Sequence, residues 1–147
     1  MSDTSYRIAD GFSDPSISTQ KWNKLLEQSS TDVVFLTKQW LQTWWKVYGR
    51  GKLLIVVAEI NDEPVAIAPM FADSGMVYFV GSGGSDYLDF IGSIKNVELL
   101  EGLLKTGISK VKNFLGFLFY HIPEGSSSIP ILEQYASSTK WYLYDEG

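Results

Sequence analysis

The chain of 147 residues contains no cysteine and only one histidine, His121. Disulfide bonds and cysteine-based metal or redox centres are therefore excluded, and so is a metal site built from several histidines. No apolar run approaches the roughly 20 residues that an α-helix needs to span a bilayer. The first residues also lack the apolar core of a signal peptide. From these absences we expect a cytoplasmic protein that does not insert into a membrane.

Positive charge is missing from the middle of the chain. Residues 53–94 contain no lysine, arginine or histidine, and the formal net charge of the whole chain is -5. This balance disfavours nucleic acid and anionic membranes as partners, and it favours a small-molecule ligand that carries an amine. The carboxylates of this stretch belong to Glu59, Asp62, Glu63, Asp73, Asp86 and Asp89.

Hydrophobic residues make up 45% of the chain, which is enough for the core of one domain over residues 1–147. Apolar periodicity predicts helices over residues 19–28, 37–48, 97–111 and 131–136. Thr19 is the expected N-cap of the first helix, Thr37 opens the second, and Gly49 and Gly51 end it.

Apolar runs between turn signals predict strands over residues 53–60, 65–71, 76–80, 114–122 and 141–144. The turns Asn61-Asp62 and Asp73-Ser74-Gly75 join the first three of these strands into an antiparallel meander. The resulting order of elements is α-α-β-β-β-α-β-α-β. It predicts an α/β (α+β) fold, in which a mixed, largely antiparallel sheet is flanked by helices.

The loop after the third predicted strand is the most informative part of the chain. Its glycines, Gly81, Gly83 and Gly84, permit positive φ angles and close approach of a ligand. The loop carries no lysine, so it lacks the Walker A pattern, and Asp86 interrupts a dinucleotide-binding fingerprint. We favour a structural turn over a phosphate cradle, because the nearby carboxylates repel a pyrophosphate.

Asp86, Tyr87 and Asp89 are the candidate ligand-binding residues of this loop. Two carboxylates beside an aromatic ring suit an amine, either as its counter-ions or as a general base. On a strand the side chains of Asp86 and Asp89 would point to opposite faces, whereas in a turn they would converge. The alternative is that Asp86 closes the loop through a hydrogen bond of its own side chain.

Trp40, Trp44 and Tyr48 recur at helical spacing, and Trp45 lies about 100° away around the same helix. Such a row packs into a core more often than it lines a groove for a sugar or peptide. One exposed aromatic in the row would mark a partner surface. His121 has no orienting partner in the sequence and is interpreted as structural. The serines lack the G-x-S-x-G pattern of a hydrolase.

Several short motifs follow one another between residues 22 and 90. The helical ones are Trp22-x-x-Leu25 and Gln39-Trp40-Leu41-x-x-Trp44. The strand motif, Glu63-Pro64-Val65-Ala66-Ile67-Ala68-Pro69-Met70, is followed by Phe79-Val80-Gly81 and Ser85-Asp86-Tyr87-Leu88-Asp89. Together they resemble the N-terminal half of the FemAB-like, cellulose-biosynthesis-type acetyltransferases of the GNAT (acyl-CoA N-acyltransferase) superfamily, whose strand motif is G-x-x-x-A-x-x-P-L. The similarity is looser from residue 91 to residue 144.

The resemblance implies a GNAT-like sheet flanked by helices, and the transfer of an acyl or aminoacyl group to an amine or hydroxyl. It also implies a donor, either acetyl-CoA or another acyl-CoA, or a charged tRNA. Members of the family carry two GNAT-like halves in a longer chain, and the donor site usually belongs to the second half. Residues 1–147 would then be the N-terminal half of a longer protein.

The superfamily binds the CoA pyrophosphate with an Arg/Gln-x-x-Gly-x-Gly/Ala loop. The corresponding place here holds Gly81, Gly83 and Gly84 without Arg or Gln. We therefore expect this chain to lack a competent donor site and to contribute the acceptor side. Asp86, Tyr87 and Asp89 would shape the acceptor groove, with Trp44 at its wall.

Two alternatives remain open at this point. The first is a non-catalytic binding or scaffold module that forms a homodimer or docks on a C-terminal partner domain. The second is a small independent acyl-CoA enzyme with an unusual donor loop.

Overall fold

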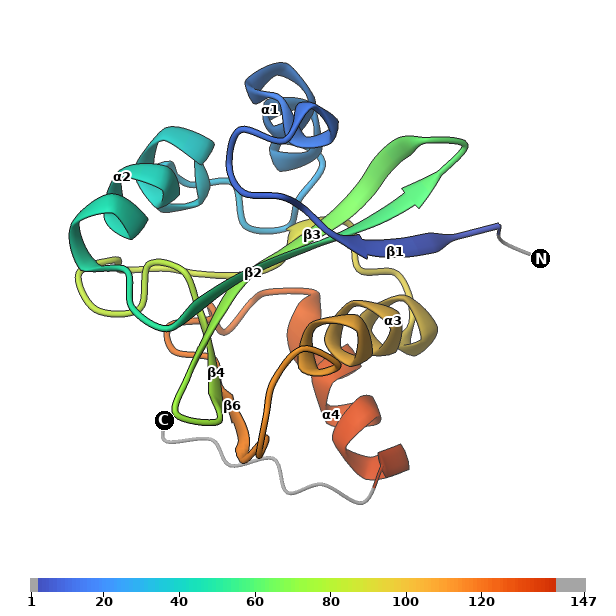
Figure 1. The fold of residues 1–147 in the computed structure, drawn as a ribbon. Helices are drawn as coiled ribbons and strands as arrows, with labels where there is room; N and C mark the ends of the chain where they lie inside the picture. The colour runs from blue at the N-terminus through green and yellow to red at the C-terminus, as the bar shows by residue number, and fades with distance from the viewer. Residues whose placement is uncertain (1–2, 140–147) are drawn as a thin grey trace.

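Six strands form one sheet within residues 3–139, the part of the chain that the computed structural model describes (Figure 1). The strands are β1 (Ser5–Ile8), β2 (Lys52–Ile60), β3 (Glu63–Asp73), β4 (Met76–Phe79), β5 (Ile91–Gly92) and β6 (Gly116–Leu118). Their order in the sheet is β1-β2-β3-β4-β6, and β5 pairs with β3 away from this path. Neighbouring strands are antiparallel except β4 and β6, which are parallel. The prediction of a mixed, largely antiparallel sheet is confirmed.

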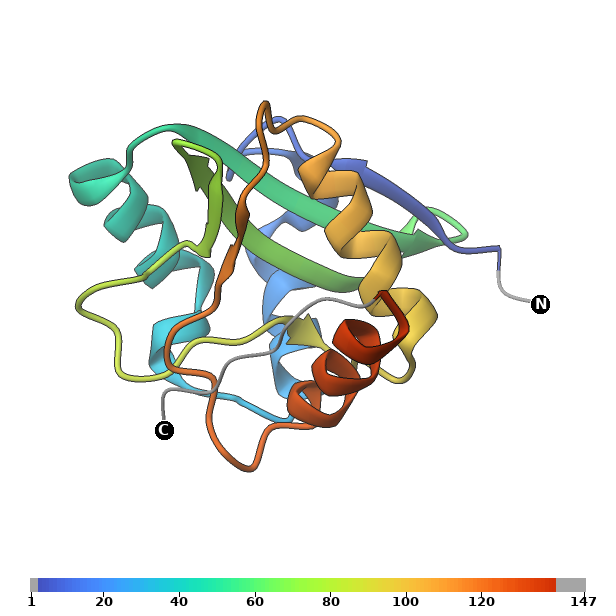
Figure 2. The ribbon, with the colours of Figure 1, turned by 90° about the horizontal axis from the view of Figure 1, so that it is seen from below.

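Helices cover both faces of this sheet. The α-helices of the described residues are α1 (Thr19–Glu27), α2 (Lys38–Tyr48), α3 (Val97–Ile108) and α4 (Ser128–Thr139). The short 3-10 helices η1 (Pro15–Ile17) and η2 (Val34–Leu36) precede α1 and α2. Figure 1 shows α1 and α2 above the sheet and α3 and α4 below it. In Figure 2, which views the lower face, α3 and α4 lie side by side.

β2, β3 and β4 form the antiparallel meander that the sequence predicts. Asn61 and Asp62, with φ angles of 52° and 64°, make the turn between β2 and β3. Ser74 and Gly75, with φ angles of 53° and 88°, make the next turn. Positive φ at both central positions matches the right-handed twist of paired strands. Residues 54–59 of β2 are buried without interruption, as expected of a strand that is covered on both faces.

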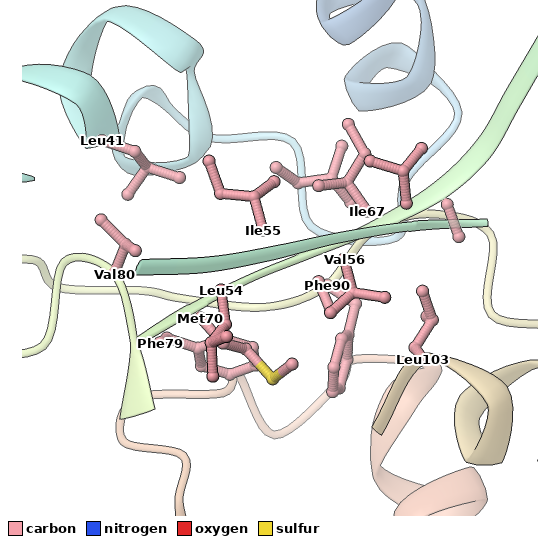
Figure 3. Close-up of a cluster of buried hydrophobic side chains, with 14 of the residues drawn as sticks. Leu41, Leu54, Ile55, Val56, Ile67, Met70, Phe79, Val80, Phe90 and Leu103 are labelled. Atoms are coloured by element: carbon pink, nitrogen blue, oxygen red, sulfur yellow. The ribbon is translucent and has the colours of Figure 1, made fainter. Parts of the chain in front are cut away.

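Successive residues of the strands divide the core into two layers (Figure 3). Side chains on the side of α1 and α2 include Leu41, Ile55, Ile67 and Val80. Those on the side of α3 and α4 include Leu54, Val56, Met70, Phe79, Phe90 and Leu103. Because side chains alternate along a strand, one apolar run supplies both layers.

β4 and β6 are joined by a crossover that contains α3, and they run parallel. The carboxyl ends of both strands therefore lie side by side at the same end of the sheet. The backbone N–H of Leu88, after β4, donates to the carbonyl of His121, after β6, at 3.0 Å. The rings of Phe79 and Phe119 stack beside this contact, with centroids 4.3 Å apart. The sheet changes from antiparallel to parallel pairing across β4.

The structure differs from the sequence prediction in several elements. The predicted order omits β1 and β5, because a four-residue edge strand and a two-residue bridge carry little apolar periodicity. The strand predicted over residues 114–122 is reduced to β6, since His121 turns the chain with a φ of 69°. The helix predicted over residues 131–136 is longer, as α4. The strand predicted over residues 141–144 lies outside the described residues.

Candidate functional site

Helix α2 presents a row of aromatic side chains to the loop that follows β4. The helix begins after Thr37, whose hydroxyl accepts the backbone N–H of Trp40, and it ends at Gly49, as the sequence predicts. Its spacing of four residues places Trp40, Trp44 and Tyr48 on one side of the helix. In Figure 1 the loop of residues 80–86, here called the glycine loop, passes directly beneath α2.

Two tryptophans of α2 are hydrogen-bonded to the glycine loop. The indole N–H of Trp44 donates to the carbonyl oxygen of Gly83 at 2.8 Å. The indole N–H of Trp40 donates to the hydroxyl of Ser85 at 2.9 Å. The hydroxyl of Ser82 in the loop donates to the carbonyl of Phe79, the last residue of β4, at 2.8 Å. These bonds fix the position of the loop relative to the helix.

The glycines of the loop fall into two groups. Gly81, Gly83 and Gly84 all have positive φ angles, of 105°, 91° and 100°. A Cβ at Gly81 would lie 2.8 Å from Leu88 and 3.1 Å from Leu41, so this glycine is required by core packing. A Cβ at Gly83 or Gly84 would meet no atom within 4 Å, so their backbone is open to an approaching molecule.

A groove of about 590 Å³ lies between α2 and the glycine loop. It is lined by Trp40, Trp44, Tyr48, Arg50, Ser82, Gly83 and Gly84. Ligand pockets in proteins range from about 300 to 1,000 Å³ and are mostly apolar and aromatic, with a few polar groups. The groove therefore has the size and the lining of a small-molecule site.

The aromatic row is partly core and partly surface. Trp44 is 6% exposed and packs against Phe71, with ring centroids 5.7 Å apart. Core burial is thus confirmed for Trp44. Tyr48 is 62% exposed, which makes it the exposed aromatic that would mark a partner surface. Trp45 also contacts Phe71, from the adjacent side of the helix.

Arg50 is the charged residue of the groove lining, and the sequence analysis did not single it out. Its Nε donates to Asp73 at 2.7 Å, and its guanidinium lies 5.2 Å from the ring centroids of Phe71 and Tyr78. The hydrogen bond to Asp73 raises the pKa of Arg50 above its ordinary value. The signal in the sequence is the position of Arg50 between the helix-ending Gly49 and Gly51, whose φ is 69°.

The structure separates the two aspartates that the sequence analysis placed in one site. Asp86 and Tyr87 are exposed at the outer side of the glycine loop, and neither lines the groove. Asp89 is 1% exposed. It accepts hydrogen bonds from the hydroxyls of Thr31, Ser126 and Ser128 and from the backbone N–H of Phe90. Since Asp86 faces solvent and Asp89 is enclosed, they do not converge on one ligand.

The carboxylates of the middle segment are also partly neutralised by residues from elsewhere. Glu59 accepts a hydrogen bond from Arg7 at 3.0 Å, and Asp73 is paired with Arg50. The groove lining contains no carboxylate. The groove lining therefore offers aromatic side chains, backbone groups and one guanidinium.

Comparison of the chain with family models, curated proteins and solved structures found no match. In residues 3–139, none of the helices combines the length and the apolar character needed to cross a membrane. Within the same residues, no group of three His, Asp or Glu side chains could hold a metal ion. The described residues thus form a mixed α/β fold with an aromatic groove beside the loop that follows β4.

Proposed function

We propose that this chain is a GNAT-like, acyltransferase-type domain, and that the groove between α2 and the glycine loop binds the acceptor. The position of the groove is the observation that carries the proposal. In open α/β sheets, ligands bind outside the carboxyl ends of strands where the strand arrangement changes. The groove lies at the carboxyl end of β4, whose two sheet neighbours are the antiparallel β3 and the parallel β6.

The lining favours an acceptor with a ring. The exposed Tyr48 and the partly exposed Trp40 supply ring faces on which the apolar face of a sugar or a planar ring packs, while the buried Trp44 forms the floor between them. The open backbone at Gly83 and Gly84 allows hydroxyl or amine groups of the acceptor to approach peptide groups closely. Asp86, exposed on the same loop, attracts an acceptor amine to the entrance.

An acyl donor such as acetyl-CoA is proposed only because the family resemblance implies one. Acyl transfer joins the acceptor nitrogen or oxygen to the acyl carbon and releases the thiol of CoA. The glycine loop carries carboxylate but no lysine or arginine, which disfavours a pyrophosphate beside it. We therefore propose that this chain holds the acceptor and that a second half of the protein holds the donor.

Titration of the 15N-labelled chain tests the acceptor site. The indole N–H signals of Trp40 and Trp44 report the groove, while that of the enclosed Trp22, bonded to Leu36, serves as internal reference. Glucosamine, which has both a ring and an amine, is expected to shift the two groove signals. Glucose lacks the amine and should shift them more weakly, and putrescine lacks the ring and should leave them unchanged. No indole shift with either sugar would contradict the proposal.

Calorimetry with acetyl-CoA tests the division between acceptor and donor. We expect no binding up to millimolar acetyl-CoA, because the glycine loop itself carries no cation and the nearby Arg50 is paired with Asp73. Micromolar binding would instead favour a small independent acyl-CoA enzyme, in which backbone N–H groups of the glycine loop hold the donor.

A scaffold role is the second candidate, and the edge of the sheet favours it. In the described part of the chain, β6 is the last strand of the sheet, and Leu115 beside it is 72% exposed. Exposed strand edges and apolar side chains are the features through which domains pair. Sedimentation should then show dimers that Leu115→Lys disrupts. Monomers alone over a wide concentration range would count against this role.

A further inference from the structure

A second hollow lies on the side of α2 that faces away from the groove. Its volume is about 380 Å³. It is lined by Thr19, Lys38, Gln39, Gln42, Thr43 and Lys46. Every one of these side chains can donate a hydrogen bond, and none is a carboxylate. The hollow is thus a cluster of donors with two positive charges in a chain whose net charge is -5.

Lys38 is the enclosed charge of this hollow, since only 8% of the residue is exposed. Its ammonium donates to the carbonyl of Ile17 at 2.8 Å. Among residues 3–139 its two other N–H groups have no acceptor. Burial lowers the pKa of Lys38, and the charge of Asp14 opposes part of that shift. An enclosed ammonium with one carbonyl acceptor retains unused capacity to bind an anion.

Asp14 is the nearby carboxylate, but its hydrogen bonds come from groups other than Lys38. Two guanidinium nitrogens of Arg7 donate to its carboxylate at 3.0 and 3.1 Å. The backbone N–H groups of Asp10 and Ser16 donate to the same carboxylate at 3.0 and 2.9 Å. Among residues 3–139 no carboxylate is hydrogen-bonded to the Lys38 ammonium, although the charge of Asp14 acts on it from nearby.

The helices bring further donors to the same place. Lys38, Gln42 and Lys46 recur every four residues along one side of α2, so their side chains border one strip of surface. Thr19 is the first residue of α1, and the bond from Lys38 to Ile17 places the ammonium beside the start of that helix. The positive end of the α1 dipole adds to the potential of the two lysines.

We propose that this hollow binds an oxyanion, a phosphate or carboxylate group of a small molecule, between Lys38, Thr19 and Lys46. The enclosed ammonium of Lys38 anchors one oxygen. Lys46 is exposed, and the long stem of a lysine lets its ammonium reach the ligand from the solvent side. The two threonine hydroxyls and the two glutamine amides hydrogen-bond the remaining oxygens. This site is independent of the aromatic groove, and its existence does not depend on the proposed acyl transfer.

Titration of the 15N-labelled chain with inorganic phosphate and with acetate tests the site, at ionic strength held constant with sodium chloride. Both anions or one of them should shift the backbone signals of Thr19, Gln39 and Thr43. A response to phosphate alone identifies a phosphate site, and a response to acetate as well identifies a general oxyanion site. Equal shifts with chloride alone would overturn the proposal.

Variants separate the site from general charge attraction. Lys46→Gln should weaken phosphate or acetate binding by about threefold, as expected for a partly screened contact. Lys24→Gln, which removes an exposed lysine of α1 outside the hollow, should leave it unchanged. Lys38→Gln should weaken binding by about tenfold or more, and its thermal unfolding verifies that the variant is folded. Equal weakening by Lys24→Gln and Lys46→Gln would overturn the proposal even if Lys38→Gln does not fold.

Discussion

The indole nitrogen of Trp44 lies 2.8 Å from the carbonyl oxygen of Gly83, so a helix above the sheet is hydrogen-bonded to the loop that follows β4. Trp40 forms a second bond of this kind to Ser85. The two bonds position the glycine loop against the aromatic row of α2. The groove is therefore held in place by α2, which the core anchors through Leu41 and Trp44.

Replacing Trp44 with phenylalanine tests the bond between α2 and the loop. Phenylalanine keeps a ring against Phe71 but has no N–H for Gly83. We expect a loss of about 1 kcal/mol in the free energy of unfolding, the usual contribution of one hydrogen bond. Urea unfolding measures the loss, and hydrogen exchange should show faster opening of the glycine loop.

Trp45→Phe is the matched control for this change. Trp45 lies next in the same helix and also packs on Phe71, but its indole forms no hydrogen bond to the described residues. The control should leave exchange in the glycine loop unchanged. Equal loop exchange in the two variants would contradict the role given to Trp44.

The glycines of the loop should respond differently to alanine. Gly81→Ala introduces a Cβ 2.8 Å from Leu88 at a φ of 105°, so we expect a loss of about 2–4 kcal/mol in the free energy of unfolding. Gly84→Ala strains the backbone alone, because no atom lies within 4 Å of the new Cβ, and should cost about 1–2 kcal/mol. Urea unfolding of both variants tests this order. A larger loss at Gly84 would show that the loop packs differently.

The two aspartates should also separate into a structural and a surface residue. Asp89→Asn replaces a carboxylate that accepts four hydrogen bonds, and we expect a loss of about 2–4 kcal/mol in the free energy of unfolding. Asp86→Asn changes an exposed side chain and should alter stability by less than about 0.5 kcal/mol. Thermal and urea unfolding give the comparison. Equal stability of the two variants would contradict the described enclosure of Asp89.

Acid should weaken the fold through Asp14. Hydrogen bonds from Arg7 are the main cause that lowers the pKa of Asp14 well below its ordinary range, while the unfolded chain titrates near about 3.9. A depressed carboxylate pKa stabilises the folded state above the unfolded pKa, and this stability is lost as pH falls toward the folded pKa. Arg7 is 38% exposed, so solvent screens the pair and we expect about 1 kcal/mol.

The measurement is urea unfolding of the wild type and of Asp14→Asn from about pH 5 to about pH 2, a range that brackets the ordinary pKa of an aspartate. The wild type should lose more stability than the variant as the pH falls. Parallel pH profiles would show that the interaction of Asp14 with Arg7 does not stabilise the fold.

Local signals predicted much of the fold. Thr37 as the start of the second helix, Gly49 as its end and the Asn61-Asp62 turn were all correct, because each depends on a few neighbouring residues. The predicted N-cap at Thr19 was wrong by one residue, since Ser18 caps α1 and Thr19 is its first residue. The continuous apolar run of β2 was also correct, since burial on both faces leaves a direct trace in the sequence. β1 was missed because its pairing with β2, rather than its own composition, makes it a strand.

The site was harder to predict, because its contacts join distant residues. Asp89 is enclosed by Thr31, Ser126 and Ser128, which lie 58, 37 and 39 residues away along the chain. The residues next to Asp89 in the sequence give no indication of these partners. The aromatic row of α2 was recognised from its spacing, but the hydrogen bond of Trp44 to Gly83 spans 39 residues. Arg50 was missed for the same reason, because its hydrogen bond to Asp73 joins residues that lie 23 positions apart.

The central claim is that the groove beside α2 binds the acceptor. It is tested most directly by the affinity of glucosamine for variants at two exposed residues of α2. Tyr48 is 62% exposed and lines the groove, whereas Val47 is 65% exposed and lies outside it, so alanine at either position should leave the fold intact. Chemical-shift titration gives the dissociation constants. We predict that Tyr48→Ala weakens binding by about fivefold, the loss of one ring contact, and that Val47→Ala binds like the wild type. Equal affinities for both variants would contradict the assignment of the groove as the binding site.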